Sequence, residues 1–373
     1  MLKKILGLFL INILFVLSSC SVNAQKPEAK SVWVAGADAG VYSAQLDMAT
    51  GSLSAVKLEV ANENFDYIVQ HPSLEILYAV SRPTKTTSAV RSYKIAEDAS
   101  LSLQSEKTDR GADGAHITVS SDGKLLAVAY YTGGDMDVYA LNDDGSIGDN
   151  VLHAKHEGTS VNKSRQEAAH PHYVGFSADN RFLYVPDLGT DHVWVYKVDG
   201  YKITLAHKIA STPGAGPRHL AFHPSLPFAY VADELVSGVT SYSVDRKTGA
   251  LKTIESLPSA VESSKERWHS VSDIRVHPSG KFLYLVNRGF DQVSVFSINQ
   301  KTGKLTPVER EPVRGSISRN IVITENGRWA LVVSRLTNAL AAYEVDQATG
   351  ELTFLTGHIY PMTTPRAIVI DRH

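Results

Sequence analysis

Short apolar runs separated by polar turns dominate the chain after residue 30. A turn of the His-Pro-Ser type recurs and begins at His71, Ser120, Ser177, His223, His277 and Thr324, with Asp371 in the corresponding place near the C-terminus. The intervals between successive turns are 49, 57, 46, 54, 47 and 47 residues. Repeats of this length are typical of β-propellers.

Each turn follows a short apolar run, such as Leu220–Phe222, and each of the first six precedes another, such as Phe228–Ala232. A third run and a polar turn ending in Thr-Gly come next, and residues 251–254 and 305–308 indicate a fourth strand. Three or four strands per unit, repeated radially, predict an all-β propeller.

The two ends of the chain are half-blades that complement each other. Residues 31–35 and 40–46 match second and third strands, whereas residues 365–370 match a lone first strand. We therefore expect one domain over residues 31–373, a seven-bladed β-propeller in which one blade is closed by the N- and C-terminal strands. Such closure leaves few exposed sheet edges.

Residues 1–20 have a different pattern. Lys3 and Lys4 precede an apolar run over residues 5–17, which is typical of an export signal. The sequence Leu17-Ser18-Ser19-Cys20 resembles the bacterial lipobox, in which the cysteine is lipid-modified and begins the mature protein. We predict a lipoprotein signal over residues 1–20, a polar tether over 21–30, and an exported protein anchored at the periplasmic side or the outer membrane. The alternative is an ordinary signal cut near Ala24, which would discard Cys20.

The composition of the chain limits the kinds of molecule that we expect it to bind. A net charge of −2 gives no basic footprint for nucleic acid, and membrane contact is expected through the lipid alone. Cys20 is the only cysteine, so disulfides and thiol chemistry have no part in the propeller. His170-Pro-His172 has the look of a metal pair, but proline constrains the backbone between the two and no further ligand stands at suitable spacing. No metal or cofactor is expected, and we expect a monomer.

Polar residues gather where one end of the channel is predicted. The first strand of a propeller blade usually lines the channel, and the loops before it and after the second strand share one face. Positions at the starts of first strands include His172, Arg218-His219, Arg319 and Arg366, and positions after second strands include Asp187, Glu234 and Arg288. Each of these residues by itself could serve only to satisfy loop backbone, but the set predicts a ligand site at the channel mouth.

Several motifs resemble the seven-bladed propeller lactonases typified by bacterial 6-phosphogluconolactonase, which are related to fungal carboxymuconate cyclase. The resemblance covers roughly residues 31–373 and rests most specifically on Gly216-Pro-Arg-His219 and Asn287-Arg-Gly289, with Ala169-His-Pro-His172 and Tyr184-Val-Pro-Asp187 beside them. It implies that the family's cleft residues fall on His172, Asp187, Arg218, His219, Glu234 and Arg288. The glutamate that is frequent in the family's sixth blade is Asp273 here, and its Pro-Arg-Asn and Ala-Asn-Gln are Ser318-Arg319-Asn320 and Val333-Ser334-Arg335.

The leading functional hypothesis is hydrolysis of an anionic sugar-acid lactone by base-activated water, without a cofactor. We expect Glu234 or His219 to be the base, His172 to transfer or orient a proton, and Arg218 and Arg288 to bind the anion and the oxyanion. Asp187, Arg319 and Arg366 are further candidates for substrate binding. Two alternatives stay open: a non-catalytic propeller that binds an anionic sugar or a protein, and an enzyme of the carboxymuconate cyclase type. Export favours a substrate other than a cytosolic phosphosugar lactone.

Overall fold

The computed structural model describes residues 28–259 and 268–373. The predicted lipid-modification site, Cys20, and most of the predicted tether lie outside these residues. All regular elements of the described residues are β-strands, and none of these residues forms a helix long and apolar enough to cross a membrane.

The strands form seven four-stranded antiparallel sheets, which we number as blades 1–7 by the order of their innermost strands. Blades 1–3 comprise β4 (Phe65–Gln70), β5 (Ile76–Ser81), β6 (Ser88–Ile95) and β7 (Leu101–Arg110); β8 (Gly114–Val119), β9 (Leu125–Tyr130), β10 (Asp135–Leu141) and β11 (Ile147–Lys155); and β12 (Gly175–Phe176), β13 (Phe182–Asp187), β14 (His192–Asp199) and β15 (Lys202–Ala210).

Blades 4–7 comprise β16 (Pro217–Phe222), β17 (Phe228–Asp233), β18 (Gly238–Val244) and β19 (Leu251–Pro258); β20 (Ser270–Val276), β21 (Phe282–Arg288), β22 (Gln292–Ile298) and β23 (Leu305–Pro312); β24 (Ser318–Ile323), β25 (Trp329–Ser334), β26 (Ala339–Val345) and β27 (Leu352–Pro361); and β28 (Pro365–Ile370), β1 (Ala29–Gly36), β2 (Gly40–Asp47) and β3 (Lys57–Ala61).

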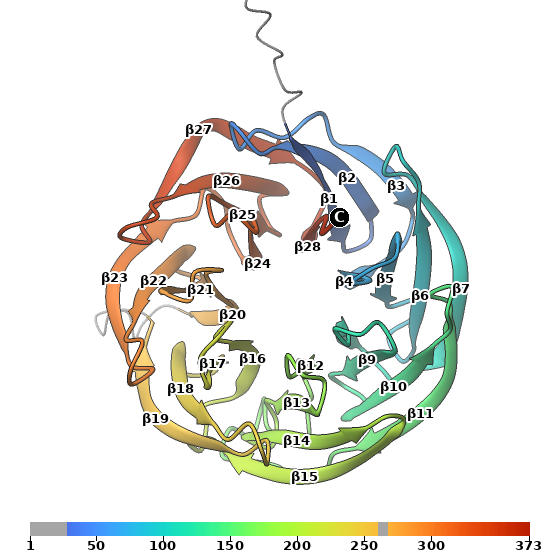
Figure 1. Cartoon of the computed structure of the whole chain (residues 1–373), viewed down its shortest axis with the longest axis vertical. Helices are drawn as coiled ribbons and strands as arrows, with labels where there is room; N and C mark the ends of the chain where they lie inside the picture. The colour runs from blue at the N-terminus through green and yellow to red at the C-terminus, as the bar shows by residue number, and fades with distance from the viewer. Residues whose placement is uncertain (1–27, 260–267) are drawn as a thin grey trace, which may run out of the picture.

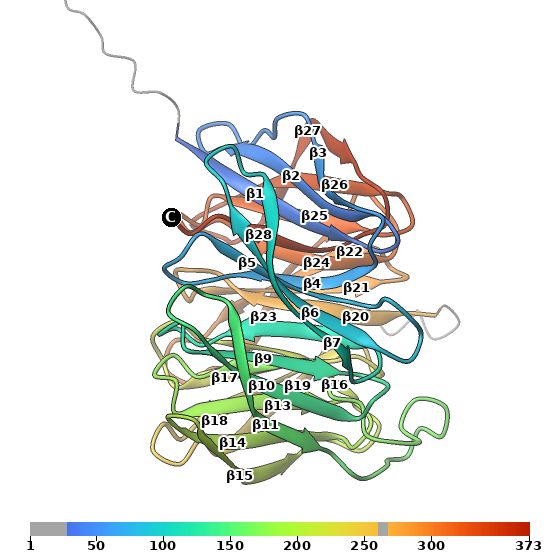
Figure 2. The ribbon, with the colours of Figure 1, turned by 90° about the vertical axis from the view of Figure 1, so that its right-hand side faces the viewer.

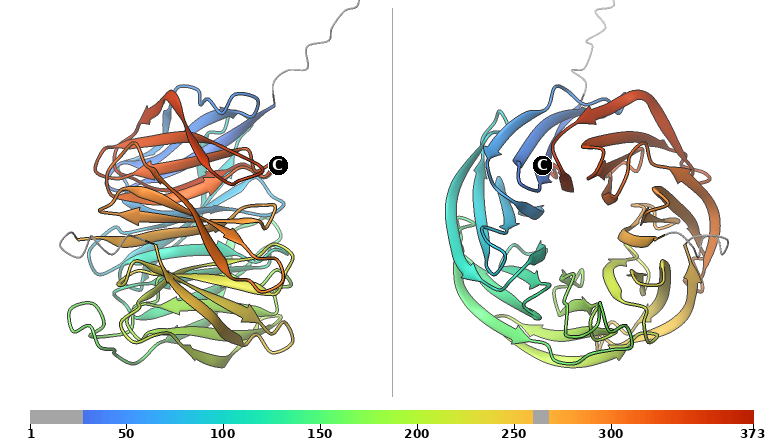
Figure 3. Two further views of the ribbon diagram at one scale, coloured as in Figure 1. Left: turned by 90° about the vertical axis from the view of Figure 1, so that its left-hand side faces the viewer. Right: turned by 180° about the vertical axis from the view of Figure 1, so that it is seen from behind.

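The sheets stand radially around a central channel (Figure 1). Blade 7 confirms the predicted closure, because the C-terminal β28 pairs antiparallel with the N-terminal β1 and Ile368 lies opposite Val34. The same ring is seen from behind and from the side in Figure 3. The sequence prediction of a seven-bladed all-β propeller is confirmed.

The recurring His-Pro turn joins neighbouring blades. His71 Nδ1 accepts the backbone N–H groups of Ser73 and Leu74 at 3.1 and 3.0 Å, so its Nε2 carries the proton and donates to the Gly123 carbonyl in blade 2 at 3.2 Å. Gly123 has φ of 72°, and a Cβ there would lie 2.5 Å from the His71 ring. One side chain thus closes its own turn and holds the next blade.

The Thr-Gly turns that follow the third strands also contact a neighbouring blade. Tyr184 and Tyr284 are fully buried in second strands, and their hydroxyls donate to the carbonyls of Gly249 and Gly350 at 2.9 and 2.8 Å. The glycines adopt φ of 78° and 81°, a region that other residues rarely enter. The hydrophobic core also lies between the blades, where the apolar faces of adjacent sheets meet.

Blade 3 has a shorter innermost strand than the other blades, because β12 comprises only Gly175–Phe176. Pro171 has no N–H to donate, and the N–H of His170 bonds the Asp187 carboxylate at 2.8 Å. A continuous ladder with β13 cannot form there, and only an isolated bridge joins Pro171 to Asp187.

The channel has two different ends. The innermost strands begin at one end, which we call the mouth, and finish at the other, which we call the lower face. In Figure 2 the C-terminus and the beginning of β1 lie together at the left, on the lower face. Lys30 Nζ donates to the His373 carbonyl at 2.6 Å, so both ends of the described chain leave from this face.

Candidate active site

A β-bulge near the mouth interrupts the pairing of first and second strands in six of the seven blades. The residues at these irregularities are Asp66, Ala115, Arg218 with His219, Ser272, Arg319 and Arg366. A bulge bends its strand and changes the direction of the extra side chain. The backbone irregularity therefore accounts for charged groups at the end of otherwise apolar strands.

Glu234 is the centre of a buried ion-pair cluster. Its Oε2 lies 2.7 Å from Arg218 Nε and 3.2 Å from Arg288 Nη2, and its Oε1 lies 2.7 Å from Arg165 Nη2. Burial alone would raise the pKa of Glu234, but the charges of Arg288 and Arg218 outweigh it and hold that pKa well below its usual range. Glu234 is therefore an ionised anchor for three guanidinium groups and is a poor proton acceptor.

Arg218 is fixed on several sides. Besides the ion pair with Glu234, its Nη1 donates to the Ser272 carbonyl and lies 3.1 Å from His219 Nε2. Burial, together with the like charge of Arg288, lowers the pKa of Arg218 to about 10, so the group stays charged at neutral pH. A guanidinium held in this way needs little reorganisation to receive a negative charge.

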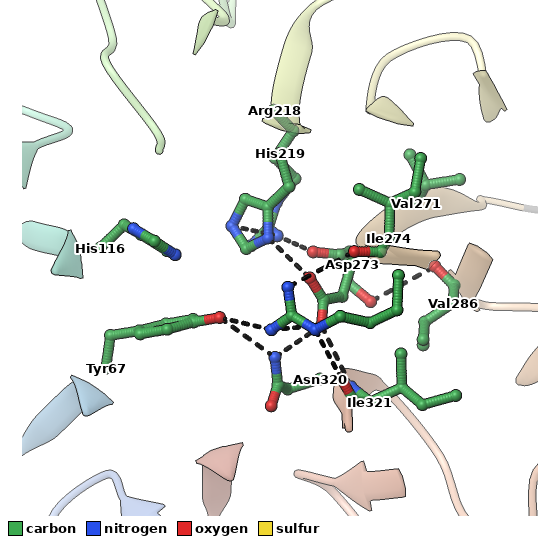
Figure 4. Close-up of polar contacts among 12 residues, drawn as sticks. Tyr67, His116, Arg218, His219, Val271, Asp273, Ile274, Val286, Asn320 and Ile321 are labelled. Atoms are coloured by element: carbon green, nitrogen blue, oxygen red, sulfur yellow. Dashed lines mark hydrogen bonds and ion pairs between the residues drawn. The ribbon is translucent and has the colours of Figure 1, made fainter. Parts of the chain in front are cut away.

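His219 lies below this cluster, between Arg218 and Asp273 (Figure 4). A carboxylate can only accept, so Nδ1 carries the proton toward Asp273 Oδ1 at 2.8 Å, and Nε2 accepts from Arg218. Burial and the charge of Arg218 lower the pKa of His219 well below its ordinary value. Both ring nitrogens are engaged, so the geometry favours a positioning role for His219 over the role of base.

His172 has a free ring nitrogen. Its Nδ1 is buried and has no hydrogen-bond partner among the described residues, and its ring centroid lies 5.1 Å from that of Tyr131 and 5.5 Å from that of His219. Burial, and then the charge of Arg218, lower the pKa of His172 well below 6.5. His172 is thus a neutral imidazole, and of the three proposed catalytic residues it alone has a ring nitrogen without a hydrogen-bond partner among the described residues.

Arg319 and Arg366 extend the positive charge across the mouth. Arg366 pairs with Asp66, which also pairs with Arg82. Arg319 has no carboxylate partner in the described part of the chain. Burial and the like charges of Arg218 and Arg288 lower the pKa of Arg319 well below its ordinary value. An anion placed beside Arg319 would relieve this repulsion.

Asp187 has a structural position that does not fit the expected role in substrate binding. Its Oδ1 accepts the N–H groups of His170, Gly189 and Thr190 at 2.8, 3.0 and 3.1 Å, and its Oδ2 lies 2.8 Å from His156 Nδ1. The side chain is fully buried. Asp187 shapes the loop that carries His172, because its acceptor sites are filled by the protein.

The sequence profile of the family described as "Lactonase, 7-bladed beta-propeller" matches residues 31–369. The 6-phosphogluconolactonase of Bacillus subtilis is 32% identical over 288 residues, which cover 77% of this chain and 82% of that protein. The 6-phosphogluconolactonase of Formosa agariphila is 31% identical over 275 residues, covering 71% of this chain and 77% of that protein.

The chain belongs to the seven-bladed β-propeller lactonase family. A candidate 6-phosphogluconolactonase from Bacteroides fragilis has a crystal structure that aligns with a TM-score of 0.83 and 27% identity, covering 92% of this chain and 98% of that one. The periplasmic gluconolactonase of Pseudomonas aeruginosa shares the fold, with a TM-score of 0.85 at 24% identity over 92% of this chain and 99% of that one.

Sequence reasoning missed one residue of the ion-pair cluster around Glu234, namely Arg165. This residue lies in the long connection between β11 and β12, and its Nη2 contacts both Glu234 and the Tyr131 hydroxyl, the latter at 3.1 Å. The interval of 57 residues between the turns at Ser120 and Ser177 is the longest in the repeat and was the available signal. Insertions in propellers fall in connecting loops, which often carry functional residues.

Proposed function

We propose that this protein hydrolyses the lactone of a sugar acid, with His172 as the base that activates water. Membership of the lactonase family and relatives named 6-phosphogluconolactonase support the reaction class. The observation that carries the residue assignment is the neutral His172 with an unpartnered Nδ1, next to guanidinium groups that are fixed by Glu234.

In the proposed reaction His172 takes a proton from water as the water oxygen attacks the lactone carbonyl carbon. The carbonyl oxygen becomes an oxyanion, and Arg218 and Arg288 are placed to stabilise its charge. Collapse of the tetrahedral intermediate breaks the bond to the ring oxygen. The proton held by His172 passes to that oxygen, which gives the open hydroxy acid and regenerates the neutral imidazole.

Glu234 serves in this scheme to hold the arginines. A carboxylate that forms ion pairs with three guanidinium groups loses much of its basicity, because protonation would leave those charges unpaired. His219 also orients Arg218, because its Nε2 contacts Arg218 while its Nδ1 is bonded to Asp273. In this mechanism His172 is the base, whereas Glu234 and His219 hold the arginines that stabilise the developing charge.

The excess positive charge at the mouth favours a substrate that carries a negative group besides the lactone. Arg319 lacks a carboxylate partner among the described residues and is repelled by its neighbours. Guanidinium groups suit carboxylate and phosphate, which they can bind through two parallel hydrogen bonds. We assign the anion of the substrate to Arg319 and Arg366, and the reacting carbonyl to Arg218 and Arg288.

A substrate panel tests the proposal. Acid release from δ-gluconolactone, 6-phosphogluconolactone and a glucarolactone is measured with the purified propeller, and the spontaneous rate, measured in buffer without protein, is subtracted. We expect enzymatic hydrolysis, with a higher kcat/KM for the anionic lactones. Absence of hydrolysis together with tight binding of the sugar acids would favour the binding-protein alternative, and conversion of carboxymuconate would favour the cyclase.

Export with a lipid anchor at Cys20 is the second part of the proposal. The described chain begins on the lower face, where Lys30 contacts His373, so a tether upstream would approach from the side opposite the mouth. The mouth would then face away from the membrane surface. Cys20→Ala is expected to release the protein from the membrane fraction or to block its processing, and the same soluble product from both forms would contradict the anchor.

A further inference from the structure

A second cavity lies in the channel on the side away from the mouth. It has a volume of about 580 Å³ and is lined by the lower halves of β4, β8, β20, β24 and β28. Pro278, Glu325 and Arg372, which follow these strands, lie at its rim, so it opens on the lower face. We call it the lower cavity. Its volume falls within the range of about 300–1,000 Å³ that is usual for small-molecule sites.

The roof of the lower cavity is a row of aromatic rings that are tilted against one another. The His116 ring lies between Tyr67 and Tyr173, with centroid distances of 4.1 and 4.2 Å. The same three rings contact His219, at centroid distances of 5.4–6.2 Å. Figure 4 shows Tyr67 and His116 beside His219 and its partner Asp273. These rings separate the lower cavity from the mouth, so a ligand here would not occupy the lactone site.

The polar groups of the roof are left with hydrogens to donate. The Tyr67 hydroxyl accepts from Arg275 Nη2 at 2.9 Å and from Asn320 Nδ2 at 3.4 Å, which leaves its own O–H free. His116 Nδ1 accepts the Val174 N–H at 3.4 Å, so in the neutral ring the proton is on Nε2. Burial lowers the pKa of His116 well below its ordinary value, which keeps the ring neutral.

Arg275 and Tyr173 add two more donors. Arg275 Nε donates to the Ile321 carbonyl at 3.0 Å, whereas Nη1 has only a contact of 3.4 Å with the Ile274 carbonyl. The Arg275 side chain lines the cavity and is 28% exposed. Tyr173 also lines the cavity, and its hydroxyl makes no hydrogen bond with any described residue.

The acceptors near the roof are occupied. Asp273 is ion-paired with Arg275, with Oδ2 3.5 Å from Arg275 Nη2. Its Oδ1 is bonded by His219, and its Oδ2 accepts from Asn320 Nδ2 at 2.6 Å and from the Ile321 N–H at 3.1 Å. The rim carries both signs of charge, since Glu325 and Asp371 lie there with Arg372. The walls between roof and rim carry the partly exposed side chains of Val69, Val276 and Val322 together with Thr118, whereas Ile117 and Ile368 are almost fully buried in the core.

We propose that the lower cavity is a second binding site, which holds a small carboxylic acid in its anionic form with an apolar body. The carboxylate would accept from Arg275, Tyr173 and the other roof donors, and the apolar body would lie against Val69, Val276 and Val322. A roof that is rich in donors, and whose neighbouring carboxylate is already bonded, selects against neutral sugars, which need both donors and acceptors around the ring. The site goes beyond the proposed lactonase activity and does not depend on it.

Titration calorimetry with benzoate tests the site, and benzamide is the neutral probe of the same shape. We expect saturable binding of one benzoate per chain and binding of benzamide at least about ten-fold weaker, since a hydrogen bond to a charged group contributes more than a neutral one. Thr118→Phe places a large side chain in the cavity and should abolish binding. Tyr173→Phe removes no hydrogen bond of the described protein and should weaken benzoate about ten-fold.

Arg319→Met is the matched control, because it removes a cation from the mouth and leaves the lower cavity intact. Benzoate should bind this variant as it binds the parent. Loss of binding in Arg319→Met with retention in Thr118→Phe and Tyr173→Phe would place benzoate in the mouth and overturn the proposal. Equal affinity for benzamide and benzoate, or no binding to the parent at millimolar concentrations, would overturn it as well.

Discussion

Arg218 in β16 forms a buried ion pair with Glu234, which directly follows the adjacent strand β17, and Arg218 Nε lies 2.7 Å from Glu234 Oε2. Both side chains are nearly inaccessible to solvent, at 2% and 3% exposure. The antiparallel pairing of the strands brings them to the same edge of the blade. Their pairing turns the expected base into an anchor for positive charge, and this changes what mutation of each residue should do.

Glu234→Gln should destabilise the protein and weaken catalysis together. The change leaves Arg218, Arg288 and Arg165 beside one another without their shared carboxylate, and breaking a buried ion pair by removing one partner costs about 3–5 kcal/mol. Urea unfolding and lactone kinetics measure both effects. Glu344→Gln is the control, because its ion pair with Arg328 is about half exposed and contributes at most about 1 kcal/mol. A Glu234→Gln protein of full stability that has lost only turnover would restore Glu234 as the base.

His172→Gln should have the opposite profile, with a loss of turnover and little change in stability. Loss of a general base lowers the rate by about 10²–10⁴-fold. KM and the thermal midpoint should change little, since Nδ1 of His172 has no partner among the described residues. His170→Gln is the control, because His170 bonds the Tyr131 carbonyl and Glu167 rather than facing a free site. Equal rates for the parent and His172→Gln would remove His172 from the mechanism.

The pH dependence follows from the lowered pKa of His172. The base must be neutral to accept a proton, and burial with the charge of Arg218 lowers its pKa below 6.5. The rate kcat/KM should therefore hold as the pH falls through 6.5 and decline only at more acidic values. Buffered rate profiles between pH 4 and 8 measure this. An acidic limb at or above pH 6.5 would mean that another group titrates.

Asp233 should make the folded protein less stable as the pH rises. Burial, only partly offset by the bond from Thr240 Oγ1 at 2.6 Å, raises the pKa of Asp233 from 3.8 to about 7. Between these pH values the native state keeps a proton that the unfolded chain has released. The contribution of Asp233 to the free energy of unfolding is therefore greatest below pH 4 and decreases as the pH rises to about 7.

Asp233→Asn removes this titration and should raise the free energy of unfolding at pH 8 by up to about 4 kcal/mol, with a smaller gain at pH 5. Denaturant unfolding of both proteins across this range measures the difference. A variant that is destabilised equally at both pH values would indicate that the ionised carboxylate has a partner in the native protein.

The terminal strand should be required for the closed ring. Deletion of residues 365–373 removes β28, in which Ala367 and Ile368 are 0% and 3% exposed. We expect a loss of several kcal/mol, because one buried isoleucine side chain alone contributes about 1.5–3 kcal/mol. Deletion of the exposed Arg372 and His373 is the control and should have a small effect. Equal melting temperatures for the parent and the longer deletion would contradict closure by this strand.

The propeller could be predicted from local sequence because each blade repeats the same turn residues and the same short apolar strands. His71 and His277 bond their own turns and the glycine of the next blade, and the Thr-Gly turns receive tyrosines such as Tyr284, so the repeat carries both its turns and its inter-blade contacts. The closure of blade 7 was also predictable, since two half-blades at the chain ends can satisfy their backbone groups only by pairing. Pro171, by contrast, shortened a first strand that apolar pattern alone would extend.

By itself, the sequence determined which residues reach the mouth, because strand order and antiparallel pairing place Arg218, Glu234 and Arg288 at one edge whatever their side chains do. Only the tertiary structure decided their roles. The Asp187 carboxylate accepts backbone N–H groups, and His219 is bonded to both Asp273 and Arg218. Arg165 lies in a connection outside the repeated strands and contacts Glu234. A pKa depends on burial and on charges within a few ångströms, and those distances join residues from different blades, which no local pattern encodes.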